Sequence, residues 1–139
     1  MFRSALLLTA FALMPAAAGA ETITYHATLS SAAEVPPNKT AGTGTATATI
    51  DTDTKMLSYT VPYTGLSGPV TAGHFHGPAG VGKNAAVLIP IIAPLASPIN
   101  GMARLSDADI ADFRAGNVYV NLHTKENPDG EIRGQISKQ

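Results

Sequence analysis

Cysteine is absent from this 139-residue chain, and its absence limits both the chemistry and the architecture. It excludes disulfide bonds, a thiol nucleophile and thiolate metal ligands. It also excludes lipid attachment of the bacterial lipoprotein kind, which requires a cysteine at the start of the mature protein. A domain of this size must then be held together by its apolar core, or partly by a metal ion.

No excess of charge of either sign is present. Nine Lys and Arg stand against ten Asp and Glu, and no basic cluster occurs, so nucleic acid is not an expected partner. No serine–histidine–acid or paired-carboxylate arrangement indicates a hydrolytic enzyme. The glycine-rich stretch 77–84 lacks the Gly-Lys-Ser/Thr ending of a phosphate-binding loop.

The N-terminus has the pattern of a signal peptide. A basic start at residues 1–3 is followed by an uncharged apolar run over 4–14 and by the small-x-small sequence 18–20. The run is too short for a membrane-spanning helix. We therefore predict a signal peptide at 1–20, cleavage after Ala20 and a mature domain at 21–139. The mature protein is expected to be periplasmic or secreted, with no stable membrane anchor.

The mature chain alternates apolar and polar residues with a period of two, in short runs separated by turn residues. One short helix is predicted, from a capping box at Ser106 to Gly116, with Ile110 and Phe113 facing inward. The pattern predicts an antiparallel Greek-key β-sandwich or flattened barrel of about eight strands. The expected strands cover residues 22–29, 42–50, 57–63, 70–77, 85–92, 100–105, 117–123 and 131–136, of which 85–92 is expected to be buried.

Three of the four histidines end strand-like runs. His74 and His76 share one strand face, while Phe75 points to the core, and His123 lies opposite the apolar residues of its own strand. If the two strands are neighbours, three imidazoles converge, as in a metal site with one His-x-His pair and one distant histidine. The alternative is that they are ordinary polar residues. His26 is interpreted as a surface histidine.

The C-terminal hairpin adds polar residues to the same face. Asn121 lies on the face of His123, and the returning arm is expected to place Glu131 and Arg133 beside them. We predict that Glu131 orients an imidazole N–H and that Arg133 attracts anions. The alternative is a polar surface with a weak salt bridge.

Four motifs in order resemble the CHRD domain, the module named after chordin. They are residues 34–37 (EVPP), 72–79 (AGHFHGPA), 115–124 (AGNVYVNLHT) and 127–135 (NPDGEIRGQ). The resemblance spans nearly the whole mature chain and implies an exported all-β module, found singly in bacteria, without a settled biochemical activity. Its motif positions include His74, His76, His123, Glu131 and Arg133. One departure is Phe75, where the family commonly has an aliphatic residue.

The His-x-His strand is also similar to that of copper-dependent superoxide dismutases, although this chain lacks their cysteine pair and shows no separate zinc ligands. Three functions stay open. The first is a surface three-histidine module that binds copper, with zinc as the alternative metal. The second is a copper-dependent redox enzyme, with Arg133 or Lys83 guiding the substrate. The third is a structural or adhesion module without metal.

Overall fold

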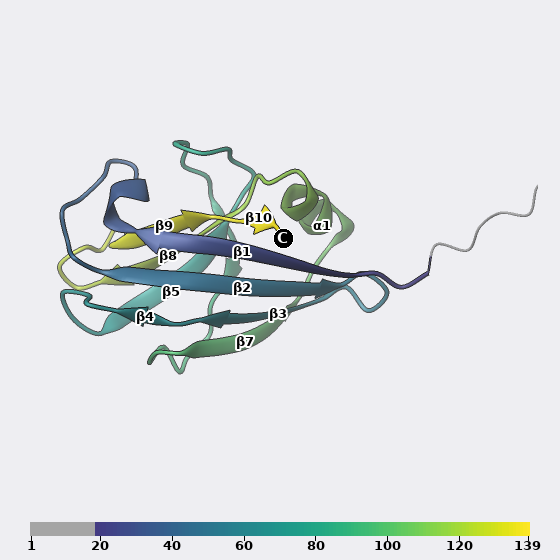
Figure 1. The fold of residues 1–139 in the computed structure, drawn as a ribbon, viewed down its shortest axis with the longest axis horizontal. Coiled ribbons are helices and arrows are strands. Elements are labelled where there is room, and N and C mark those ends of the chain that lie inside the picture. The colour runs from purple at the N-terminus through teal and green to yellow at the C-terminus, as the bar shows by residue number, and fades with distance from the viewer. Residues whose placement is uncertain (1–18) are drawn as a thin grey trace, which may run out of the picture.

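The computed structural model describes residues 19–139, so that nearly all of the predicted signal peptide at 1–20 lies outside the described residues. Within that range the regular secondary structure is mostly strand, with one α-helix and one 3-10 turn (Figure 1). The elements in chain order are β1 (Thr22–Ser30), η1 (Ser31–Ala33), β2 (Thr43–Asp51), β3 (Met56–Val61), β4 (Tyr63–Thr64), β5 (Val70–His76), β6 (Val87–Pro90), β7 (Ile99–Arg104), α1 (Asp107–Arg114), β8 (Tyr119–Thr124), β9 (Ile132–Gln135) and β10 (Ser137–Lys138).

The strands form one antiparallel sheet that nearly closes into a barrel, in the order β6-β5-β8-β9-β1-β2-β3-β7. Short β4 and β10 pair with β2 and β1. β1, β2 and β3 follow one another as hairpins, and β9 returns from late in the chain to lie beside β1, which is a connection of the Greek-key kind. The predicted all-β antiparallel fold with one short helix is confirmed.

Alternation along each strand sends one set of side chains into a common core. Tyr25, Leu57, Phe75 and Leu122 have no exposed surface, although they come from four different strands. Burial of such side chains stabilises the fold by roughly 1.5–3 kcal/mol each relative to an exposed position. The predicted core position of Phe75 is confirmed, so the departure from the family pattern at this residue leaves the strand face intact.

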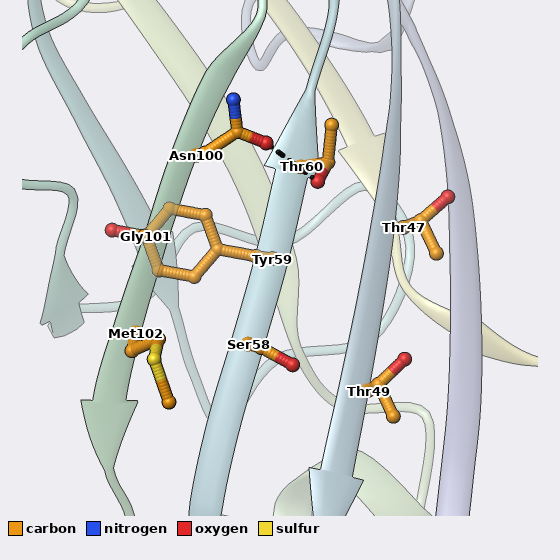
Figure 2. Close-up of a pocket in the computed structure, with 8 residues that line it drawn as sticks. All are labelled: Thr47, Thr49, Ser58, Tyr59, Thr60, Asn100, Gly101 and Met102. Carbon is orange, nitrogen blue, oxygen red and sulfur yellow. Dashed lines mark hydrogen bonds between the residues drawn. The ribbon is translucent and has the colours of Figure 1, made fainter.

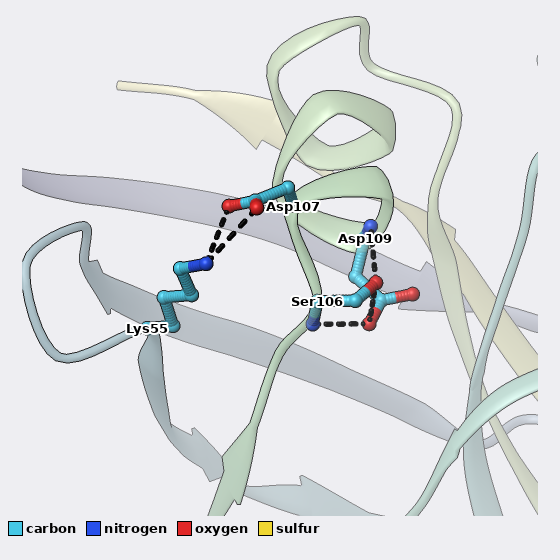
Figure 3. A network of polar contacts seen from close by, with 4 residues as sticks. All are labelled: Lys55, Ser106, Asp107 and Asp109. Atoms are coloured by element: carbon cyan, nitrogen blue, oxygen red, sulfur yellow. Dashed lines mark hydrogen bonds and ion pairs between the residues drawn. The ribbon is translucent and has the colours of Figure 1, made fainter.

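Helix α1 begins where the sequence predicts. The Ser106 side chain accepts a hydrogen bond from the Asp109 N–H, and the Asp109 carboxylate accepts from the Ser106 N–H (Figure 3). Lys55 approaches Asp107 to 2.8 Å, an exposed ion pair that contributes little. Ile110 and Phe113 face the core, as predicted, and the helix ends before Gly116, whose φ is +71°.

The segment 85–92 differs from its prediction as a buried strand. Only 87–90 form a strand, β6, and it lies at one end of the strand order. Val87 is 50% exposed and Ile92 is 64% exposed, whereas Ile89 and Ile91 are buried. An edge strand is covered on only one face here, so a continuous apolar run does not require burial on both.

β8 shows the opposite behaviour, because all six of its residues are buried. One face packs on the core through Val120 and Leu122. The other face, which carries Asn121 and His123, is covered by loops. No helix in the described part of the chain is both long and apolar enough to cross a membrane.

Strand β9, the hairpin partner of β8, has no room for a side chain at Gly134. A Cβ there would lie 2.4 Å from the carbonyl oxygen of Thr28 on β1. We expect Gly134→Ala to lower the free energy of unfolding by about 1–3 kcal/mol or more, since a backbone atom must move to admit the methyl group. Gly80→Ala is the control, because a Cβ at Gly80 meets nothing within 4 Å. Urea denaturation measures both variants, and equal losses would contradict this account of β9.

Candidate metal centre

The register of β5, β8 and β9 aligns the polar residues into rows. His74 pairs with Asn121, which pairs with Arg133, while His76 pairs with Tyr119 in the next row. His123 pairs with Ala72. Because β5 and β8 are direct neighbours, the distant histidine of the sequence lies on the same face as the His-x-His pair.

The three imidazoles converge as predicted. Nδ1 of His74 lies 3.0 Å from Nε2 of His123. One nitrogen from each of His74, His76 and His123 lies within 4.8 Å of the other two. This spacing is somewhat wider than the roughly 3–4 Å between nitrogens that share one ion at about 2.0–2.1 Å.

Backbone carbonyls orient two of the rings. Nδ1 of His123 lies 2.9 Å from the carbonyl oxygen of Pro128, and Nδ1 of His76 lies 3.0 Å from that of Ala85. A carbonyl oxygen only accepts, so Nδ1 carries the proton in both rings. Their Nε2 atoms are therefore the nitrogens that face the cluster, where Nε2 of His123 lies against Nδ1 of His74 and Nε2 of His76 lies against the Asn121 amide. Donation of the other ring N–H to a carbonyl is the usual support of a metal-binding histidine.

The environment favours the uncharged form of two of the three rings, His74 and His123. Burial lowers the pKa of His74, and the neighbouring His123 and His76 lower it further. Burial also lowers the pKa of His123, against the opposing effect of its bond to Pro128. Both rings are accordingly neutral at pH 7, which is the protonation state that binds metal.

The site is not on the surface, which corrects one prediction. His76 and His123 are each only 9% exposed. Loop residues Glu34 and Pro36 on one side and Asn84 on the other wall a pocket over them of about 380 Å³. The sequence pattern shows which face of a strand is polar, but it does not show that a loop folds over that face.

Asn121 and Arg133 both act on His76. Oδ1 of Asn121 lies 3.1 Å from Nε2 of His76. The Arg133 guanidinium lies 3.4 Å from the ring centre of Tyr119, and that ring stacks on His76 with centroids 4.8 Å apart. Arg133 also donates to Oδ1 of Asn84.

Arg133 is therefore not a steering cation, contrary to the expectation for the redox enzyme. It is 2% exposed, and its guanidinium also donates to the carbonyl oxygen of Lys83. Its role is to hold the loop over the site and to fix the Tyr119–His76 stack. Lys83 itself is exposed.

Glu131 also lies elsewhere than predicted. Its fully buried carboxylate accepts from the backbone N–H and the hydroxyl of Ser67, from the Thr124 hydroxyl and from Asn127, and it contacts none of the three histidines. The bonds from Ser67 and Thr124 lower its pKa against the raising effect of burial. Glu131 precedes β9, which begins at Ile132, so the alternation of that strand does not determine where its side chain points.

Sequence reasoning missed Glu34. Its side chain is 6% exposed and lines the pocket together with His76, Asn121 and His123. Burial raises its pKa to about 7, and the Arg133 charge and the Asn121 amide oppose this only partly. Oε1 has no hydrogen-bond partner among the described residues. The sequence signal that could have identified Glu34 is its position directly before Val35-Pro36-Pro37, because the two prolines stiffen the loop that carries the carboxylate.

A second hollow, of about 430 Å³, lies on the outer face of β2, β3 and β7 (Figure 2). It is lined by hydroxyl and amide side chains, and Thr60 donates to Oδ1 of Asn100 at 2.8 Å. It contains no histidine or carboxylate. It therefore offers no group for metal binding or for proton transfer near neutral pH.

The raised pKa of Glu34 predicts a pH-dependent effect of removing its charge. Between its ordinary pKa of 4.5 and about 7, the folded state holds a proton that the unfolded state has released, so stability falls as pH rises. We expect Glu34→Gln to stabilise the protein by roughly 2 kcal/mol more at pH 8 than at pH 5, measured by urea denaturation. Glu126→Gln, which removes an exposed carboxylate nearby, is the control. A gain independent of pH would show that Glu34 titrates normally.

Comparison with known proteins identifies the family. No curated protein and no solved structure matches the chain significantly. The family model of the CHRD domain matches residues 25–136, which include every residue of the site described above. The chain therefore belongs to the CHRD-domain family.

Proposed function

We propose that this domain binds a copper ion through His74, His76 and His123 after export from the cytoplasm. The observation that carries the proposal is the convergence of three ring nitrogens within 4.8 Å, two of them on rings whose other nitrogen donates to a backbone carbonyl. Export is supported by the basic start, apolar run and small-residue cleavage pattern of the N-terminus.

Copper is preferred to zinc on ligand chemistry. The cluster offers three imidazole ligands, and affinity for such nitrogen sites peaks at Cu(II) among the divalent first-row metals. Structural zinc sites are closed by a fourth protein ligand, commonly a thiolate, and this chain has no cysteine. Zinc remains the alternative that the experiment decides.

Metal analysis of protein purified from its native compartment tests the proposal directly. We expect close to one copper per chain and an electron paramagnetic resonance spectrum with nitrogen coupling, both lost in His123→Ala. N-terminal sequencing of the same sample checks that the mature chain begins at Glu21. If the protein contains zinc instead of copper, the assignment of the metal changes. If it contains no metal, the proposal is refuted.

Metal binding predicts a rise in thermal stability. Binding to the native state alone stabilises by RT ln(1 + [L]/Kd), about 2.7 kcal/mol when copper is at a hundredfold excess over Kd. We expect His123→Ala to remove most of this shift in melting temperature. His26→Ala is the matched control. His26, on β1, hydrogen-bonds to Thr47 on β2 and to Gln139, and it lies outside the cluster. Equal shifts in wild type and His123→Ala would place the site elsewhere.

Binding is favoured over redox catalysis because one of the two expected steering groups is buried. Arg133 donates to Asn84 and to the Lys83 carbonyl and cannot draw anions through bulk solvent, which leaves only the exposed Lys83 for that role. We expect copper-loaded protein to remove superoxide far below the diffusional ceiling of about 10⁸–10⁹ M⁻¹s⁻¹, as measured by pulse radiolysis. A rate near that ceiling, abolished in His76→Ala, would make the protein an enzyme.

A further inference from the structure

We propose that the pocket beside Glu34 is a transient binding site, in which a hydrated divalent cation contacts the Glu34 carboxylate before the three histidines coordinate it. The proposal rests on the proposed function and adds the route by which the metal arrives. It assigns Glu34 a role in the rate of metal uptake rather than in the final coordination.

The first support is the state of the Glu34 side chain. It is 94% buried by surface area, and its Oε1 has no hydrogen-bond partner among the described residues. Buried polar atoms in folded proteins are almost always paired, because an unpaired one costs free energy. The buried Glu131 carboxylate, seated nearby, has four donors. An unpartnered carboxylate oxygen that lines a pocket is an acceptor available to a group that enters the pocket.

The second support is the residue that packs against that oxygen. A Cβ built on Gly130 would lie 2.6 Å from Oε1 of Glu34 and 2.8 Å from Nδ2 of Asn121. Any side chain at Gly130 would therefore collide with the carboxylate, and its φ of +131° also disfavours other residues. Because this residue is glycine, the turn places no side chain against the carboxylate.

The third support is that Glu34 lies in the same pocket as two of the histidines. His76 and His123 line it together with Glu34, so a cation at the carboxylate needs no further opening to reach them. The volume of about 380 Å³ admits an ion with six waters, which needs on the order of 200 Å³. Hard, hydrated cations prefer carboxylate oxygen as a first contact.

The charges around the pocket favour a cation. Its lining contains two carboxylates, Glu34 and Asp129, and no lysine or arginine. Arg133 lines a neighbouring hollow together with Glu34, and its guanidinium lies over the Tyr119 ring and donates to the loop at 83–84. A cleft with one sign of charge and low-dielectric walls raises the local concentration of the opposite ion and its association rate.

The test is the kinetics of copper uptake. Wild-type protein is mixed with Cu(II) in a stopped-flow instrument, and quenching of tyrosine fluorescence reports binding, because the chain has no tryptophan and Tyr119 stacks on His76. We expect Glu34→Gln to slow association about threefold to tenfold at low ionic strength. Its dissociation rate, measured by transfer to a chelator, is expected to stay within twofold of wild type.

Two controls separate local from global charge. Asp53→Asn makes the same change in net charge in the exposed turn between β2 and β3, and we expect it to leave association unchanged. Added salt should slow wild-type association more than that of Glu34→Gln, since screening acts on the charge that was removed. Asp129→Asn, at the exposed rim, should slow association less than Glu34→Gln.

The outcomes distinguish this inference from the function on which it rests. Equal association rates in wild type and Glu34→Gln would overturn it, and so would a change in dissociation alone, which would make Glu34 a positioning residue acting through Asn121. If His123→Ala took up copper with wild-type rate and affinity, the proposed function would fail instead. If copper uptake depended on the histidines but not on Glu34, only the transient binding site would be refuted.

Discussion

Burial of the second face of β8 is the constraint on which the rest of the site depends. β8 packs on the core with one face, as any strand of the barrel does, but loops also cover its polar face. Each polar side chain enclosed there must find a partner or bear the cost of lacking one. The hydrogen bonds of Asn121 and His123 are the response to this requirement, and they determine which ring nitrogens face the cluster.

Two buried glutamates meet that constraint in opposite ways. Glu131 receives donors from Ser67, Thr124 and Asn127, and these bonds hold its pKa low despite burial. Glu34 lies in the loop cover with too few donors, and burial raises its pKa to about 7. The residue type is the same in both, so the difference lies in the surroundings. The Glu131 carboxylate stabilises the turn that follows His123, while the Glu34 carboxylate can still interact with a group that enters the pocket.

The alternation of side chains was sufficient to predict the fold class, the core position of Phe75 and the shared face of His74 and His76, because a period of two depends only on local geometry. The meeting with His123 also required β5 and β8 to be neighbours, which alternation does not determine. Alternation failed where the chain leaves strand geometry: Glu131 precedes β9, and its side chain does not follow the face that alternation assigned to it. The burial of Arg133 and Glu34 depends on where two irregular loops come to rest, and no local pattern encodes that.

The origin of the histidines also bears on what a metal would do here. His74 and His76 come from β5 and His123 from β8, two strands already joined by backbone hydrogen bonds and by a core with no exposed surface at Phe75, Val120 and Leu122. A metal that crosslinks such neighbours constrains the unfolded chain, but it organises little that is not already in place. Domains that depend on a metal to fold instead bring together ligands that nothing else holds. The position of the cluster therefore favours a metal that is bound and released over one that serves only as structural support.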